Sequence, residues 1–465
     1  MVDAAYYLDL LRPLFKGRRV ILAGMVLAGA TPIVDMLRRL GADRCLVVAT
    51  GLGTGPLPSP ESTDWVFFPR YTNDVVTELR EIGRHLASPP ADVVAAIDRF
   101  DPDRRAIVVP PIITLGPVPD RMAGRPVWAR RPEASLPLED KTTVDALWDR
   151  LGVRRAPSET VVCFIDAMIG AHQRLDHGAG TVFSGDGREG PHGGAHLVRW
   201  VRRDDDLIDA VALYAEHCDR VRVMPFLEGI PCSIHGLVFD DAAVALRPVE
   251  LIVLRPAEGS RFLYAGAATF WDPPENDRDH MRAVARTLAS TYRKQVGTGC
   301  FTIDGILSHD GWLPTELNPR FGAGLNVIAR GLPDLPLTLL CQALQGGERL
   351  DYRPADLERY LLQAADNHRH GGGWTTIPHR QAETRTHSLV REGAAFRLAR
   401  PMEPPDGSLM IGPSVAGGFI RFTAEPARTV TGRSIAPEVV AAFALADREF
   451  GTGLGPLAAA QDVRQ

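Results

Sequence analysis

The first third of the chain alternates between two hydrophobic patterns. Apolar residues recur at helical spacing over residues 6–15 and 32–40, and continuous apolar runs over 19–23 and 44–49 are typical of buried strands. Strands that alternate with helices favour a parallel sheet with helices on both faces. We therefore expect residues 1–138 to form a Rossmann-like α/β domain.

A glycine run, Thr50-Gly-Leu-Gly-Thr-Gly55, follows the second predicted strand. A dinucleotide-binding fingerprint needs a helix directly after its glycines, and Pro56 and Pro58 stand there instead. We interpret the run as a loop at the end of the sheet. A Rossmann-type oxidoreductase built on these glycines is a rival hypothesis, and such a protein would bind a nicotinamide without releasing ADP.

Residues 300–320 have the pattern of a β-hairpin. Apolar residues alternate on the first arm, and Asp310-Gly311 is a turn signal. A three-residue loop over 309–311, with Gly311 in the left-handed conformation, would fix which residues lie opposite each other. The pairs are then Asp304 with Glu316 and Thr302 with Asn318. All four side chains share one face, because strand side chains alternate with period two.

Two carboxylates directly opposite each other repel and destabilise a sheet unless a cation lies between them. Two carboxylates and an amide offer oxygen ligands only, which suits a hard ion such as Mg²⁺. The predicted metal ligands are therefore Asp304, Glu316 and Asn318. Arg320 follows directly and adds a planar cation suited to phosphate or carboxylate. The alternative is a solvated hairpin whose charges extend into water.

Composition indicates a globular protein of two to four domains, with 465 residues, 45% hydrophobic content and a net charge of −5. This charge argues against a general binder of nucleic acid, which needs clustered positive charge. The six cysteines form no CxxC pair, so they indicate neither a disulfide framework nor a zinc site and fit a reducing cytoplasm. No run reaches the ~18 apolar residues of a membrane span. The basic, apolar stretch 18–30 resembles a signal peptide but starts late, and we favour a buried strand there.

Lysine is rare, with three lysines among 52 basic residues, so each one is of interest. Lys141 begins an amphipathic helix predicted over residues 139–152, which ends at Gly152. A lysine near the start of a helix opposes the helix dipole, which suggests that it points at an anion. The alternative is chance retention on a solvated face.

Residues 178–194 are rich in glycine and precede a strand-like segment, 195–201. We expect a flap whose bare amides close over phosphates, since glycine lets the backbone approach closely. The alternative is a surface loop. An apolar strand over 220–225 then ends at Pro225, and further strands are predicted over 233–239 and 243–253.

In this order the segments resemble the ATP-grasp superfamily of carboxylate–amine ligases, over roughly residues 139–345. The sequence Glu316-Leu-Asn-Pro-Arg320, followed by Phe-Gly-Ala-Gly324, carries the most specific part of the resemblance. The layout, with a Rossmann-like region before and a long tail after, is similar to the peptide ligases of the pheganomycin type. The resemblance implies an α/β (α+β) fold with three parts: a pre-ATP-grasp domain (1–138), an ATP-grasp domain with antiparallel sheets (139–349), and a small C-terminal lid or interaction domain (350–465).

The resemblance also implies ATP and Mg²⁺ as cofactors and assigns roles to residues of this chain. Lys141 would contact nucleotide phosphates, residues 224–227 would present backbone to adenine, and Glu228 would lie near the ribose. Arg320 would act as the catalytic cation on the transferring phosphate or the substrate carboxylate. The nucleotide-binding set is Lys141, Ser184, Arg188, Met224, Phe226, Leu227 and Glu228.

One departure from the family concerns the strand that enters the flap. Many members carry a second lysine there, whereas this chain has Thr181-Val-Phe-Ser184. Arg188 or Arg199 is expected to replace it.

The resemblance implies a cytoplasmic, ATP-dependent peptide ligase of natural-product (antibiotic) biosynthesis. It would activate a small-molecule carboxylate as an acyl phosphate and join it to the amine of an amino acid or peptide. A ligase of two single amino acids and a non-catalytic nucleotide-binding relative are the alternatives. Neither nucleic acid nor membrane is an expected partner, and a homodimer is left open.

The tail contains a helix predicted over residues 437–450 and a glycine-rich segment over 412–422. His368, His370 and His379 could suggest a metal site. We prefer a polar loop at 368–373 that closes over the site or meets a partner subunit.

Overall fold

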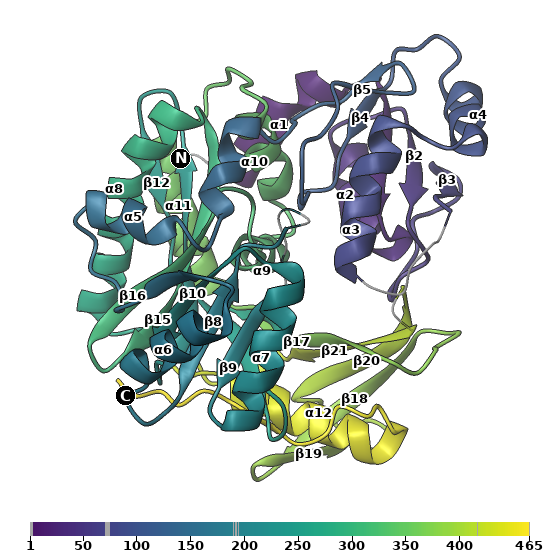
Figure 1. Cartoon of the computed structure of the whole chain (residues 1–465). Helices are drawn as coiled ribbons and strands as arrows, with labels where there is room; N and C mark the ends of the chain where they lie inside the picture. Colours follow the sequence, from purple (N-terminus) through teal and green to yellow (C-terminus); the bar gives the residue numbers. More distant parts are fainter. Residues whose placement is uncertain are drawn as a thin grey trace.

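The computed structural model describes residues 3–69, 75–188, 190, 193, 195–415 and 417–464. It is a mixed α/β structure in which a parallel sheet, a small antiparallel sheet and a large antiparallel sheet are linked in chain order (Figure 1). The predicted α/β fold with antiparallel sheets is confirmed. The predicted domain boundaries after residues 138 and 349 stay predictions.

The N-terminal sheet is parallel, in the order β3-β2-β1-β4. Its strands are β1 (Arg19–Met25), β2 (Arg44–Ala49), β3 (Thr63–Phe67) and β4 (Ile107–Val109). The helices around it are α1 (Ala4–Phe15), α2 (Leu27–Arg39), α3 (Val75–Ala87) and α4 (Ala91–Phe100). β1 is buried on both faces, because Val20 packs in the cluster of α1 and α2 while Ile21 packs in that of α3 and α4. The sequence pattern predicted α1, β1, α2 and β2, with an earlier start for α2 and a later end for β1 in the structure, but it did not predict β3, β4, α3 or α4.

The segment between the parallel sheet and the small antiparallel sheet contains short elements: β5 (Arg121–Met122), β6 (Arg125–Pro126), the 3₁₀ helix η1 (Glu133–Glu139) and α5 (Val144–Arg150). The predicted helix over 139–152 is therefore shorter than expected. Lys141 lies in the turn before α5, where the side chain of Asp140 accepts from the backbone and hydroxyl of Thr142. The predicted end at Gly152 is confirmed, since this residue has the left-handed φ of +64° that glycine adopts easily.

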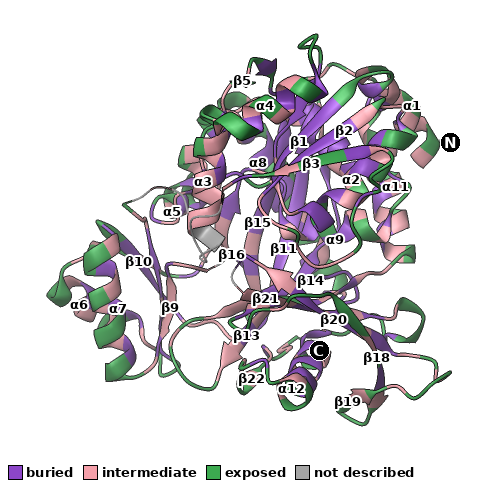
Figure 2. Ribbon diagram, turned by 90° about the vertical axis from the view of Figure 1, so that its right-hand side faces the viewer, coloured by how far each residue is buried: buried purple, intermediate pink, exposed green. Residues whose placement is uncertain are grey.

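The small sheet is antiparallel, in the order β7-β10-β8-β9. Its strands are β7 (Glu159–Val162), β8 (Thr181–Gly185), β9 (Val198–Val201) and β10 (Arg220–Pro225). Helices α6 (Ile165–Leu175) and α7 (Asp204–His217) pack on the face that carries Phe183, Val221 and Val223. Figure 2 shows this unit standing out to one side of the large sheet. Because side chains alternate along a strand, Val182, Ser184, Arg222 and Met224 lie on the opposite face.

The large sheet contains twelve strands among the described residues. Its main path runs β16-β15-β11-β13-β14-β17-β21-β20-β18-β19; off this path, β12 pairs with β11 and β22 pairs with β13. The first strands are β11 (Ile230–Val238), β12 (Ala243–Ala245), β13 (Val249–Pro256), β14 (Leu263–Ala268), β15 (Gly299–Ser308) and β16 (Gly311–Asn318). The helices of this part are α8 (Glu275–Gln295), α9 (Ala323–Gly331), α10 (Leu337–Gln345) and α11 (Pro354–Asn367).

The single strand predicted over 243–253 is wrong. β12 ends at Ala245 and β13 begins at Val249, with Arg247 and Pro248 between them. The buried Arg247 guanidinium donates to the Trp271 carbonyl at 2.9 Å and also pairs with Asp272 and Asp366, each at 2.6 Å. A proline and a buried charge that needs partners from other elements break the strand.

The tail continues the large sheet through β17 (Gly371–Ile377), β18 (Arg385–Glu392), β19 (Ala395–Leu398), β20 (Gly407–Ser414) and β21 (Gly417–Ala424). The polar loop predicted at 368–373 is therefore only partly correct: residues 368–370 lie outside any helix or strand, but Gly371 already pairs with β14. A Cβ at Gly373 would lie 2.1 Å from the Val439 side chain of α12 (Ala436–Phe450), so the glycine lets this helix pack tightly on the strand. The helix itself was predicted. β22 (Leu457–Ala458) and the 3₁₀ turn η2 (Pro426–Arg428) complete the tail.

Candidate active site

The hairpin β15–β16 brings the predicted metal ligands together. Asp304 lies opposite Glu316, and Thr302 lies opposite Asn318, as predicted. The route to this register differs from the expected one, because Ser308 pairs with Gly311 and leaves a two-residue loop. A β-bulge at Thr315, between the pairs Gly305–Pro314 and Asp304–Glu316, supplies the extra residue instead. Gly311 has a φ of +94°, which the predicted turn also required.

The two carboxylates share a set of neutral and positive partners. Asp304 Oδ1 accepts from the Ser233 hydroxyl at 2.5 Å, and Asn318 Nδ2 donates to both Asp304 Oδ2 and Glu316 Oε1 at 2.9 Å. Burial raises the pKa of Asp304 above its ordinary value. The Asn318 amide, two residues after Glu316 on the same strand, therefore bridges the two acids.

Cations complete the cluster. Lys141 Nζ forms an ion pair with Glu316, and burial lowers the pKa of this lysine to about 8. Arg320 donates to Asn318 Oδ1 at 2.9 Å and pairs with Glu139 at 2.7 Å. Arg131 holds the other Glu139 oxygen at 2.5 Å. Burial acts to raise the pKa of Glu139, but Arg320 and Arg131 keep it below its ordinary value.

Sequence reasoning missed the roles of Glu139, Arg131 and Ser233. Glu139 fixes the orientation of Arg320, and the acid is itself buried, with its side chain 5% exposed. The only signal in the sequence was its place two residues before Lys141.

The donor set fits Mg²⁺. Two carboxylates and one amide from neighbouring strands share a face, and Lys141 and the Asn318 amide lie where a cation would neutralise the acids. Mg²⁺ is commonly held by one or two carboxylates together with phosphate oxygens, so a third acid is not required. Accordingly, the part of the chain that the structure describes has no group of three or more His, Cys, Asp and Glu residues placed to hold a metal, at the tail histidines or elsewhere.

The predicted adenine-contacting segment lies at the end of β10. Met224 is buried in an apolar cluster with Ala156 and Leu313, against which Val182 and Leu227 also pack. These residues come from both the small sheet and β16, so the cluster joins the two sheets. The backbone N–H of Phe226 donates to the Gly180 carbonyl at 3.0 Å, which continues the pairing of β10 with β8 beyond Pro225.

Glu228 belongs to a second cluster at the same strand end. Both of its oxygens accept from Arg255 at 2.7 Å, and the Gln461 backbone N–H donates to it at 3.0 Å. The Arg255 guanidinium lies 4.9 Å from the centre of the Phe226 ring, which stacks on Trp200 at 4.2 Å. The C-terminal segment thus fixes the predicted ribose contact, a link that no local sequence pattern indicates.

The two arginines expected to replace the second lysine have their contacts away from the cluster of Asp304, Glu316 and Lys141. Arg188 pairs with Asp219 at 2.7 Å and donates to the Glu216 carbonyl at 2.9 Å. Arg199 lies opposite Phe183 and therefore on the helix-covered face of the small sheet. Ser184 lies on the face of Val182 and Met224. Positions 189, 191, 192 and 194 of the predicted flap lie outside the described residues.

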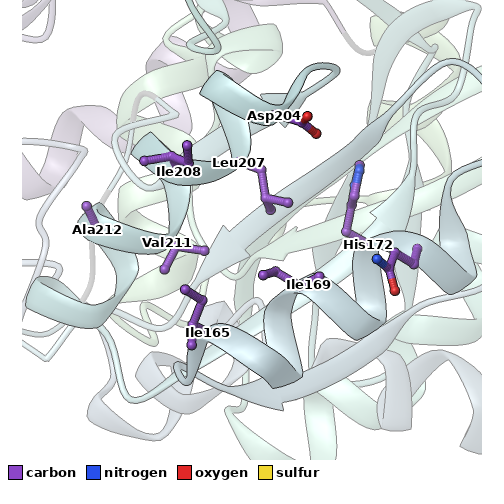
Figure 3. Close-up of a pocket in the computed structure, with 9 residues that line it drawn as sticks. Ile165, Ile169, His172, Asp204, Leu207, Ile208, Val211 and Ala212 are labelled. Atoms are coloured by element: carbon purple, nitrogen blue, oxygen red, sulfur yellow. The ribbon is translucent and has the colours of Figure 1, made fainter.

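A cavity of about 600 Å³ lies elsewhere, between α6 and α7 (Figure 3). Its walls are mainly aliphatic, from residues that include Ile165, Ile169, Leu207, Ile208 and Val211. Because these helices cover the Phe183 face of the small sheet, the cavity is separated by that sheet from the carboxylates. No predicted site residue lines it.

No protein-family model matches the chain, and no curated protein sequence matches it. Solved structures do resemble it. Biotin carboxylase from Campylobacter jejuni aligns with a TM-score of 0.52 at 9% identity, over 96% of this chain and 92% of that one. The biotin carboxylase domain of the Hydrogenobacter thermophilus 2-oxoglutarate carboxylase gives 0.50 at 12% identity, over 96% and 91%. Carboxyaminoimidazole ribonucleotide synthase from Aspergillus clavatus gives 0.50 at 12% identity, over 93% and 99%.

The chain has the ATP-grasp fold. This likeness spans nearly the whole chain, including the N-terminal parallel sheet and the strands of the tail. In the described ranges, no helix is both long enough and apolar enough to cross a membrane.

Proposed function

We propose that the protein is an ATP-dependent carboxylate–amine ligase. It activates a carboxylate as an acyl phosphate, releases ADP, and joins the acid to an amine. The observation that carries this proposal is the cluster of Asp304, Glu316 and Asn318 with Lys141 and Arg320 on one face of the hairpin. Such a set of paired acids and cations suits the transfer of a phosphoryl group, whose negative charge must be neutralised.

Similar folds support the choice of nucleotide and metal. The Aspergillus clavatus synthase was solved with ATP, and the Hydrogenobacter thermophilus domain with MgADP and bicarbonate. In this chain Asp304, Glu316 and Asn318 would hold Mg²⁺, which when bound neutralises phosphate charge. Lys141 would leave Glu316 for a phosphate, and the apolar cluster around Met224 would receive the adenine.

Arg320 is the proposed catalytic cation. Glu139 and Asn318 hold its guanidinium in a fixed orientation, so it is preorganised to meet the negative charge that develops on the transferring phosphoryl group or on the acyl oxygen. An amine then attacks the acyl phosphate, and phosphate leaves. The proposed substrates are a small carboxylic acid and an amino acid or peptide amine, as in peptide ligases of natural-product biosynthesis.

A screen with a surrogate amine tests the reaction class. The protein is incubated with Mg²⁺, ATP, hydroxylamine and single carboxylic acids, and both ADP and hydroxamate are measured. We expect ADP and hydroxamate to appear together, in equal amounts and only with particular acids. Release of AMP and pyrophosphate, or ADP formation that ignores the acid, would contradict an acyl-phosphate ligase. Binding of a nicotinamide nucleotide in place of ATP would support the oxidoreductase instead.

A further inference from the structure

The face of the small sheet that is turned toward β16 carries one buried arginine. Arg222 lies on β10 directly opposite Ser184 of β8, and only 2% of its side chain is exposed. Its guanidinium lies next to the carboxylate hairpin, because Nη1 donates to the carbonyl of Thr315 at 3.3 Å, one residue before Glu316. It is also close enough to Lys141 to help lower the pKa of that lysine, although burial is the larger cause.

The partners of Arg222 leave one nitrogen unused. Nε donates to Asp145 Oδ2 at 2.7 Å, and Nη1 is also 3.4 Å from Met224 Sδ. Nη2 is buried and has no hydrogen-bond partner among the described residues. A buried guanidinium N–H without an acceptor costs free energy, so it is rarely kept without a ligand or another role.

Asp145 holds the guanidinium in position from α5. The same Oδ2 accepts from the Ser158 hydroxyl at 2.5 Å, so this carboxylate is fixed from two sides. Nε and Nη1 of Arg222 thus donate to one carboxylate oxygen and one carbonyl, and within the described ranges Nη2 is the nitrogen that remains without an acceptor, as Asp145 Oδ1 remains without a donor. The hydroxyl of Ser184, the residue directly opposite on β8, does not bond this nitrogen either.

We propose that Arg222 binds the polyphosphate of the nucleotide, as the cation of the small sheet that works together with Lys141, and that Asp145 is its positioning residue. This inference rests on the nucleotide use proposed above. Arg222 replaces both candidates suggested by the sequence, since Arg188 is bound to Asp219 and Arg199 lies on the helix-covered face. Planar arginine suits phosphate oxygens, with which it forms paired hydrogen bonds.

Binding measurements on the full chain separate phosphate recognition from structural support. Arg222→Met keeps much of the side-chain volume and removes the charge. We expect the Kd of MgADP, measured by calorimetry, to rise roughly 10- to 100-fold, as for loss of a charged hydrogen bond. The Kd of adenosine should change less than about twofold, since adenosine has no phosphate. Equal losses for both ligands, or no loss for either, would overturn the proposal.

Two further variants keep the test decisive if Arg222→Met does not fold. Arg222→Lys retains the charge but not the planar fork, so it should weaken MgADP and leave adenosine unchanged. The double variant Arg222→Ser with Ser184→Lys moves the cation across the strand pair and should recover most of the MgADP affinity. Two results together would overturn the assignment. The double variant would fold and bind adenosine without recovering MgADP affinity, and Arg222→Lys would bind MgADP as well as wild type does.

The matched control is Arg174→Met. Arg174 is a cation of the same unit that also pairs with a carboxylate, Glu159 on β7 at 2.6 Å, but its side chain is 59% exposed on α6. Its loss should leave MgADP binding within about twofold. The ligase proposal can fail while this one holds: wild type would then bind MgADP through Arg222, but no carboxylic acid would lead to release of ADP. If wild type binds no nucleotide, both proposals fail together.

Discussion

The hairpin β15–β16 and the strand pair β8–β10 meet at the candidate site, but their charges arise in different ways. On the hairpin, both acids and the amide come from one stretch of chain whose turn fixes the register. On the small sheet, Arg222 meets Ser184 only because β10 pairs with a strand that lies far from it in the sequence. The site residues of the hairpin can therefore be predicted from local spacing. The position of the small-sheet cation depends on a pairing of distant strands, which is seen only in the folded chain.

The most damaging change to the hairpin should be Glu316→Gln. It keeps the shape of the side chain but removes the charge that Lys141 neutralises and that Mg²⁺ would require. We expect ADP formation to fall at least ~100-fold, in the range seen when one preorganised charged contact of a transition state is lost. A coupled assay for ADP measures the rate, and circular dichroism checks the fold.

Asp310→Asn is the matched control, because it removes one negative charge from the exposed loop of the same hairpin. That variant should retain wild-type activity. Full ADP formation in Glu316→Gln would remove the metal assignment from the hairpin altogether.

A smaller effect is expected for Lys141→Ala, which tests whether the lysine that pairs with the hairpin in the free chain also binds the nucleotide. The variant should raise the KM for ATP by roughly 10- to 100-fold, since a charged hydrogen bond to phosphate contributes about 1.5–3 kcal/mol. The KM of the acid should stay nearly constant. Lys141→Arg is not expected to restore the ATP KM, because guanidinium is wider and planar. An ATP KM that stays the same in Lys141→Ala would leave this lysine as a structural partner of Glu316.

Asp304→Asn should be milder still. One negative charge and the Asn318 amide remain, and an amide at position 304 can still bond the Ser233 hydroxyl. We expect a loss of about tenfold in ADP formation, partly recovered by higher Mg²⁺, in keeping with one oxygen ligand kept and one charge lost. A titration of the rate against Mg²⁺ distinguishes this from a defect in folding, which added metal would not repair.

Much of the fold followed from patterns of short range. The strands Arg44–Ala49 and Arg220–Pro225 have the predicted bounds, and the helix Ala436–Phe450 begins one residue before the expected start. Errors arose where distant residues decide the structure. Pro248 and the buried Arg247 divide a strand that reads as continuous, and Gly371–Gly373 read as a loop although they pair with β14 and β21.

The candidate site divides along the same line. Asp304 and Glu316 were correctly placed opposite each other, even though the extra residue lies at Thr315 and not in the loop. The contacts of Arg320 with Glu139 and of Glu228 with Arg255 join segments far apart in the chain. No spacing rule links such residues, so they could not be predicted from one sequence.

The smallest expected effect concerns a buried acid on the opposite face of the large sheet, which can be compared with the acids of the hairpin. Glu250 is a buried acid on β13 like Asp304 on β15. Among the described residues its donors are neutral and include the Ser434 hydroxyl and the Ile435 backbone N–H at 3.1 Å, whereas Lys141 and Arg320 lie close enough to Asp304 to act against the effect of burial on its pKa. Burial raises its pKa to about 7 from an ordinary 4.5. Between these values the folded chain holds a proton that the unfolded chain has lost, so the free energy of unfolding should fall as pH rises from 4.5 to 7.

Glu250→Gln should remove this part of the pH dependence, because a glutamine accepts from Ile435 and donates to Ser434 without ionising. At pH 8 the variant should be more stable than wild type by about 1–3 kcal/mol, while near pH 4 the two should be close. Urea unfolding at both pH values measures the difference, with the exposed Glu449→Gln as the control. Parallel pH profiles for wild type and Glu250→Gln would mean that this acid is ionised in the folded chain. A buried carboxylate would then be stable in this sheet without a cation, and burial alone would not explain why Lys141 pairs with Glu316.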